Sequence, residues 1–87
     1  MAESEVKSGP NPEKLIEAIA TAILGKTEEI FVEAFPEDSQ TVIELEVPEE
    51  DVGRLIGRQG RTAKALRTVL NAVSERANKR YTLEIVE

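Results

Sequence analysis

Apolar residues recur at helical spacing in the first part of the chain. Asn11 and Pro12 have the character of a helix cap and a first-turn proline, and Gly25 provides a stop signal. Between them the spacing places one set of apolar side chains on a single face: Leu15, Ile16, Ile19, Ala20, Ile23 and Leu24. We therefore predict an amphipathic helix from residue 12 to about residue 24.

Two stretches after this helix have the pattern of strands. Residues 28–35, EEIFVEAF, are rich in β-branched and aromatic side chains but are apolar on both faces, which leaves the orientation of this strand open. Residues 40–47, QTVIELEV, alternate, with Thr41, Ile43, Leu45 and Val47 on the more apolar face. A turn at residues 36–39 would join the two strands as a hairpin.

The rest of the chain predicts two helices and a last strand. Pro48 opens a short helix whose first turn is acidic, as the helix dipole favours, and whose buried side would be Val52, Leu55 and Ile56. A longer helix over about residues 61–77 carries one apolar stripe, formed by Leu66, Val69, Leu70, Val73 and Ala77. In residues 81–87, YTLEIVE, one strand face would carry Tyr81, Leu83 and Ile85.

The element order αββααβ predicts an α+β domain with a three-stranded mixed sheet covered on one face by three helices. A connection through two helices would make strands 40–47 and 81–86 parallel neighbours. We expect residues 1–10 to form a disordered tail, and residues 11–87 to form a single domain.

Composition narrows the classes of function. The 87 residues include no cysteine and no histidine, which removes thiolate metal sites, disulfides and the commonest general base. So short a chain also has few residues with which to shape a pocket. We therefore expect no enzymatic activity, metal or cofactor. No apolar run reaches the roughly 20 residues of a membrane span, and the acidic start does not resemble a signal peptide, so we expect a cytoplasmic protein without a membrane partner.

The charge is unevenly distributed. The net charge is −6, and residues 1–51 hold 14 acids against 3 bases. Residues 52–74 hold no acid and five bases: Arg54, Arg58, Arg61, Lys64 and Arg67. On the predicted helix, Arg61, Lys64 and Arg67 lie nearly opposite the apolar stripe and should project into solvent. The pattern indicates one cationic patch on an acidic domain.

The cationic stretch surrounds two glycines, Gly57 and Gly60, in the segment LIGRQGRTAKALR. These glycines could simply end one helix and begin the next. Glycine also lets a ligand approach the backbone closely, and the start of a helix offers free N–H groups to a phosphate. The segment lacks the Gly-Lys-Ser/Thr ending of a P-loop and the spacing of a dinucleotide fingerprint. We favour a clamp for the backbone of a nucleic acid.

The stretch VGRLIGRQGRTAKAL, residues 52–66, resembles the Ile-Gly-x-x-Gly core of KH domains, and the element order matches their type II arrangement. The chain most resembles the small single-domain bacterial RNA-binding proteins of the KhpA family. The resemblance implies a groove for about four nucleotides of single-stranded RNA or DNA. By this resemblance the clamp would consist of Gly57, Arg58, Gln59 and Gly60.

The resemblance also implies roles for the residues around the clamp. An apolar platform would comprise Val52, Leu55, Ile56, Ala63 and Leu66, with Ile43 and Leu45 approaching it from the sheet; for each of these the alternative role is core packing. A cationic rim would comprise Arg54, Arg61, Lys64 and Arg67, with a solvated helix face as the alternative. The partners that the family implies are single-stranded RNA, a second copy of the chain, and a larger multi-domain KH RNA-binding protein.

Two other functions fit parts of the pattern. A DNA-binding helix-turn-helix also places a short turn before a basic helix, although the three strands disfavour its simplest forms. A protein-interaction module with little RNA affinity would use the acidic face to dock a basic partner. An RRM is disfavoured, because its strands need stacking aromatics and the chain has only Phe31, Phe35 and Tyr81.

Overall fold

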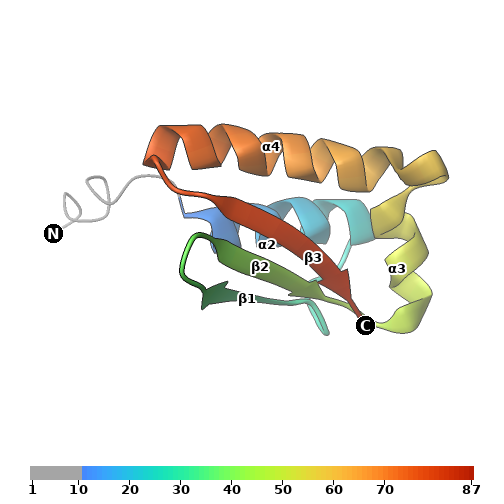
Figure 1. The fold of residues 1–87 in the computed structure, drawn as a ribbon. Coiled ribbons are helices and arrows are strands. Elements are labelled where there is room, and N and C mark those ends of the chain that lie inside the picture. The colour runs from blue at the N-terminus through green and yellow to red at the C-terminus, as the bar shows by residue number, and fades with distance from the viewer. Residues whose placement is uncertain (1–10) are drawn as a thin grey trace, which may run out of the picture.

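The computed structural model describes residues 11–87. Its elements are α2 (Pro12–Leu24), β1 (Phe31–Pro36), β2 (Thr41–Glu46), α3 (Glu49–Ile56), a 3-10 turn η1 (Arg58–Gly60), α4 (Arg61–Ala77) and β3 (Tyr81–Val86), as seen in Figure 1. The order αββααβ and the α+β class are confirmed. The tail expected at residues 1–10 lies outside the described residues, and the division of the chain into tail and domain stays a prediction.

Helix α2 begins and ends where local chemistry predicts. The side chain of Asn11 accepts a hydrogen bond from the backbone N–H of Lys14 at 3.0 Å, which satisfies one free donor of the first turn. Gly25 adopts a left-handed conformation with φ 75°, and its N–H donates to the carbonyl of Thr21 at 2.8 Å. A residue with a side chain would be strained at this position, so the glycine stops the helix.

The three strands form one mixed sheet in the order β1-β2-β3. Strands β1 and β2 are antiparallel, and β2 and β3 are parallel, as predicted. The pairs Ala34↔Ile43 and Ile43↔Leu83 place apolar residues of all three strands in one row. The turn between β1 and β2 closes with a 2.7 Å hydrogen bond from the N–H of Glu37 to the carbonyl of Gln40.

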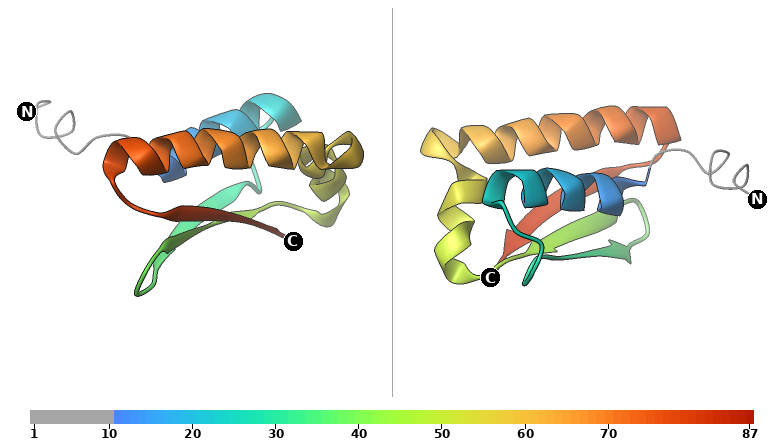
Figure 2. Two further views of the ribbon diagram at one scale, coloured as in Figure 1. Left: turned by 45° about the horizontal axis from the view of Figure 1, so that its top comes forward. Right: turned by 180° about the vertical axis from the view of Figure 1, so that it is seen from behind.

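The helices lie on one side of the sheet (Figure 2). Helices α2 and α4 run across this face, while α3 stands at the end of the sheet near the C-terminus. The core between the layers consists of Ile16, Ala20, Leu24, Ile30, Ile43, Leu45, Val47, Leu55, Leu66, Leu70 and Leu83. None of the helices in residues 11–87 is long and apolar enough to cross a membrane.

An ion pair joins the segment after α2 to the start of α3. Asp51 is 6% exposed, and its Oδ2 lies 2.7 Å from Lys26 Nζ and makes no other polar contact with the described residues. The hydrogen bond with Asp51 raises the pKa of Lys26 above its ordinary value of 10.5. The acidic start of α3 is therefore anchored to the fold at one position.

Strand β1 differs from the prediction. It begins at Phe31, because Glu29 adopts φ 67° in a turn and Ile30 is buried just before the strand. It also extends to Pro36, which had been placed in the turn. The open question of its orientation is settled, since Val32 and Ala34 pack against the core. Phe31 and Phe35 consequently face away from it.

Two residues predicted to be buried are exposed. Ile56 is 38% exposed and Val69 is 37% exposed. Each lies one position, about 100° around the helix, from a fully buried leucine, Leu55 or Leu70. The neighbouring layers cover only the leucine side of α3 and α4. The predicted apolar stripes were therefore wrong at these two positions.

Candidate nucleic-acid interface

The predicted glycine loop forms a sharp junction between α3 and α4. The N–H of Gly57 donates to the carbonyl of Gly53 at 2.8 Å and ends α3. The next three residues form the single turn η1, in which the N–H of Gly60 donates to the carbonyl of Gly57 at 3.1 Å. Gln59 adopts φ 58° within this turn, and its side chain and that of Arg58 are exposed. Two side chains thus project from a tightly wound loop.

The two glycines meet different requirements. Gly57 has φ 79° and ψ 171°, a region that essentially only glycine occupies. A Cβ atom there would also lie 2.9 Å from the backbone nitrogen of Thr62 and 2.7 Å from its Cβ. Gly60 has φ 75° and ψ 14°, and a Cβ atom there would meet nothing within 4 Å. Gly57 is therefore needed for packing, whereas Gly60 borders open space.

Helix α4 begins beside this open space without a capping side chain. Its first turn contains no acidic residue, and Gly60 occupies the cap position. The N–H groups of a first helical turn lack partners within the helix, and they form the positive end of its dipole. The N–H of Arg61 donates to the carbonyl of Arg58 in η1, so the junction offers the next N–H groups of the turn and a partial positive charge.

Three cations surround this helix start. Arg58, Arg61 and Lys64 are exposed, and none of them forms an ion pair within residues 11–87. Positive charge at the start of a helix opposes its dipole at a cost of roughly 0.3–1 kcal/mol for each group. The local charges thus favour an anion at this position.

Two other cations of the predicted rim, Arg54 and Arg67, donate hydrogen bonds to backbone carbonyls. Arg54 donates through Nη2 to the carbonyl of Ile23 at 3.0 Å and so closes the last turn of α2. Arg67 donates through Nη2 to the carbonyl of Leu83 on β3 at 3.4 Å. Arg67 is nevertheless exposed, as predicted, and this contact reaches a free backbone acceptor of the edge strand β3.

Most residues of the predicted apolar platform pack inside the protein. Those that are buried are Ile43, Leu45, Leu55, Ala63 and Leu66, all between 0% and 4% exposed. Val52 is half-buried and Ile56 is exposed directly before Gly57. The platform accessible from the junction is therefore small, with Ile56 and Val52 as its apolar side chains.

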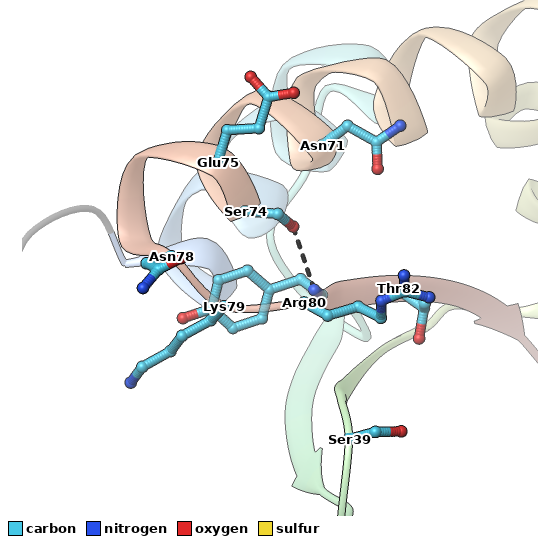
Figure 3. Close-up of a pocket in the computed structure, with 9 residues that line it drawn as sticks. Ser39, Asn71, Ser74, Glu75, Asn78, Lys79, Arg80 and Thr82 are labelled. Carbon is cyan, nitrogen blue, oxygen red and sulfur yellow. Dashed lines mark hydrogen bonds between the residues drawn. The ribbon is translucent and has the colours of Figure 1, made fainter.

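The sequence did not point to the seam between α4 and β3. A hollow of about 180 Å³ there is lined by Arg67, Leu70, Asn71, Tyr81, Thr82 and Leu83. A larger and more open hollow of about 700 Å³ lies at the far end of α4, lined by the residues drawn in Figure 3. There Ser74 accepts a hydrogen bond from the N–H of Tyr81 at 3.0 Å, which ties α4 to β3.

Only part of this seam could have been found in the sequence. The spacing of Arg67, Asn71 and Ser74 on the predicted long helix places three polar side chains along one face. The sequence does not show that these side chains lie next to β3, because that depends on the order of the strands in the sheet. Among residues 11–87 no group of three or more His, Cys, Asp or Glu side chains is arranged to hold a metal ion.

The chain is similar to curated bacterial proteins over most of its length. The RNA-binding protein KhpA of Borreliella burgdorferi is 38% identical over 82 residues, which cover 94% of this chain and 100% of that protein. The RNA-binding protein KhpA of Treponema pallidum is 41% identical over 75 residues, covering 86% of this chain and 94% of that protein. No solved structure matches the chain with significance. The family model described as KhpA/KhpB, KH domain, matches residues 13–85, so the chain belongs to the KhpA/KhpB family of KH domains.

Proposed function

We propose that this protein binds a short segment of single-stranded RNA, with the loop of Gly57, Arg58, Gln59 and Gly60 against the phosphate backbone. The observation that carries the proposal is the start of α4, where three exposed cations without ion-pair partners in residues 11–87 surround an uncapped helix end. The relatives described above carry RNA-binding in their names, which supports RNA as the ligand.

The backbone of the ligand would lie against the open side of the junction. Gly60 leaves room for it, because nothing lies within 4 Å of the position that a Cβ atom would take. The N–H of Arg61 already donates to the carbonyl of Arg58, but the N–H groups that follow it in the first turn of α4 can donate to one phosphate, as helix starts do in other phosphate sites. Arg58, Arg61 and Lys64 add attraction that does not depend on the base sequence.

The bases would extend from the loop toward the α4–β3 seam. Ile56 and Val52 supply apolar contact beside the loop, with Ala63 as part of the buried support below. Arg54 and Arg67 contribute charge at the edges while they hold the carbonyls of Ile23 and Leu83. Tyr81 is the one aromatic side chain lining the seam, so the stacking worth roughly 1–3 kcal/mol per base is mostly missing. We expect weak binding with little sequence preference.

The test replaces Arg58 and Gln59 by aspartates and keeps both glycines. Both side chains are exposed, and aspartate tolerates the left-handed conformation of residue 59, so stability should change by only about 0.5 kcal/mol. The local charge falls by three where the phosphate would lie. We expect RNA affinity to fall at least about tenfold, or roughly 1.4 kcal/mol, measured by fluorescence anisotropy with a labelled oligonucleotide.

A matched control makes the same change of net charge on another helix. Lys14 and Ala18 are exposed on α2, and replacing both by aspartate also removes three units of charge. This control should bind RNA within about twofold of the unchanged protein, since exposed charges farther than about 10 Å apart are screened at 0.1 M salt. If the loop variant binds like the control, the loop is only a turn, and a protein-interaction module becomes the better description.

The proposal concerns binding and includes no catalytic step. Family membership also supports two protein partners, namely a second copy of the chain and a larger multi-domain KH RNA-binding protein. A cytoplasmic location is part of the same proposal, since RNA is the intended ligand. Size-exclusion chromatography with light scattering tests self-association directly.

A further inference from the structure

The second face of the sheet is not covered by any helix within residues 11–87 (Figure 2). Glu33, Glu44 and Glu84 lie side by side on this face, because Glu33 pairs with Glu44 and Glu44 pairs with Glu84 in the strand register. Glu46 lies on the same face, one row away. The three strands contain no lysine or arginine, so these carboxylates have no cation within the sheet.

Two aromatic side chains flank the row of glutamates. Phe31 is 62% exposed and Phe35 is 40% exposed, and they are the only phenylalanines of the chain. The register places Phe31 beside Glu46 and Phe35 beside Val42. Apolar and acidic side chains therefore share one face, and the two aromatic rings lie on its β1 edge.

The fold itself does not explain this face. Like charges that lie directly opposite each other destabilise neighbouring strands, and exposed phenylalanines lose the benefit of burial. An RNA strand would be repelled by the carboxylates. A cationic ligand with apolar side chains would relieve both costs at once.

We propose that this face docks a cationic amphipathic helix of another protein. Three strands about 4.8 Å apart and six residues long form a surface of roughly 14 by 20 Å, on the order of 300 Å². A helix is about 10–12 Å wide and fits that surface, and helices are the usual cover of a sheet face. Apolar side chains of the helix would contact Phe31 and Phe35, and its lysines or arginines would pair with Glu33, Glu44, Glu46 and Glu84.

A second copy of this chain fits the face poorly. Joining two such faces would bring eight carboxylates together without a cation. The surface is also well below the roughly 800 Å² per partner of a stable interface. The cationic part of a second copy is the start of α4, so docking it here would cover the proposed RNA site of that copy. Charge therefore favours a separate basic segment.

The test uses a synthetic helical peptide of leucine, alanine and lysine with all leucines on one face. A control peptide has the same composition with the leucines scattered. NMR spectra of the labelled protein should show amide shifts in β1, β2 and β3 with the first peptide and at least about fivefold weaker binding of the control. Shifts confined to α4, equal binding of both peptides, or no binding would overturn the proposal.

Two variants assign the contacts. Replacing Phe31 and Phe35 by threonine, a residue favourable in strands, should weaken the peptide at least about fivefold. Replacing Glu44 and Glu84 by glutamine removes the repulsion, so this variant should fold at least as well and yet bind the peptide more weakly. Both variants should keep their RNA affinity, which separates this proposal from the function of the loop. A dimer of the unchanged protein that dissociates in the phenylalanine variant would assign the face to a second copy and overturn the proposal.

Discussion

Helices α3 and α4 meet at one junction but begin with opposite charges. The first turn of α3 carries Glu49, Glu50 and Asp51, which suit the positive end of its dipole. The first turn of α4 carries no acid, and it holds Arg61 beside the exposed Arg58 of the loop. Acidic residues therefore stabilise the start of α3, whereas the start of α4, a few residues later, carries positive charge that its dipole disfavours.

The contrast indicates that the start of α3 serves the fold and that the start of α4 is available to a ligand. Asp51 is buried against Lys26, so the start of α3 is completed within the protein. The start of α4 stays exposed and lacks a capping side chain, and its cations would be stabilised by an external anion. Departures from local rules are expected at functional sites. In the proposed function, a phosphate of the RNA would supply the negative charge that the α4 start lacks.

The largest expected effect separates the two glycines of the junction. Replacing Gly57 by alanine should cost about 3 kcal/mol of unfolding free energy, because the alanine would be strained and would overlap Thr62. Replacing Gly60 by alanine should cost only about 1 kcal/mol, since its surroundings are open and only the left-handed backbone resists. Urea denaturation measures both changes. Equal losses would mean that the junction does not pack as described.

The sequence predicted the fold well because each element carries its own signals. Asn11, Pro12 and Gly25 set the ends of α2, and the alternation over residues 40–47 set the inward face of β2. The orientation of β1 was not predictable, since EEIFVEAF is apolar on both faces and only its pairing with β2 decides which side is buried.

The candidate site was predicted less completely than the fold. Charge counting and the glycine pair located the junction, because both signals are local in the chain. The sequence could not show that Arg54 and Arg67 reach the carbonyls of Ile23 and Leu83, which lie 31 and 16 residues away along the chain. Likewise, burial of Ala63 and exposure of Ile56 depend on which side of each helix the neighbouring layers cover.

A second prediction concerns salt. If about three phosphates contact the cations of the α4 start, the logarithm of RNA affinity should fall with the logarithm of salt concentration with a slope near −2. A fourfold rise in salt would then weaken binding about 16-fold. Anisotropy titrations at several salt concentrations give the slope, and the variant with aspartates at 58 and 59 should give a shallower one. An affinity independent of salt would argue against contacts with the backbone.

The smallest effect is also the most specific, because one substitution should move stability and binding in opposite directions. Arg61 lies at the first position of α4 and is exposed. Replacing it by glutamate should raise the unfolding free energy by about 0.5–1 kcal/mol through the helix dipole. The same change should weaken RNA binding about fivefold, or roughly 1 kcal/mol.

The matching control acts on α3. Glu50 is exposed in the first turn of α3, and replacing it by arginine should lower the stability by a similar amount without weakening RNA binding. The deciding measurement is therefore the unfolding free energy and the RNA dissociation constant of the Arg61→Glu variant, determined together. We predict a more stable protein that binds RNA more weakly. A variant that is no more stable, or that binds RNA as tightly as the unchanged protein, would contradict the conclusion that the start of α4 is kept cationic for an RNA phosphate.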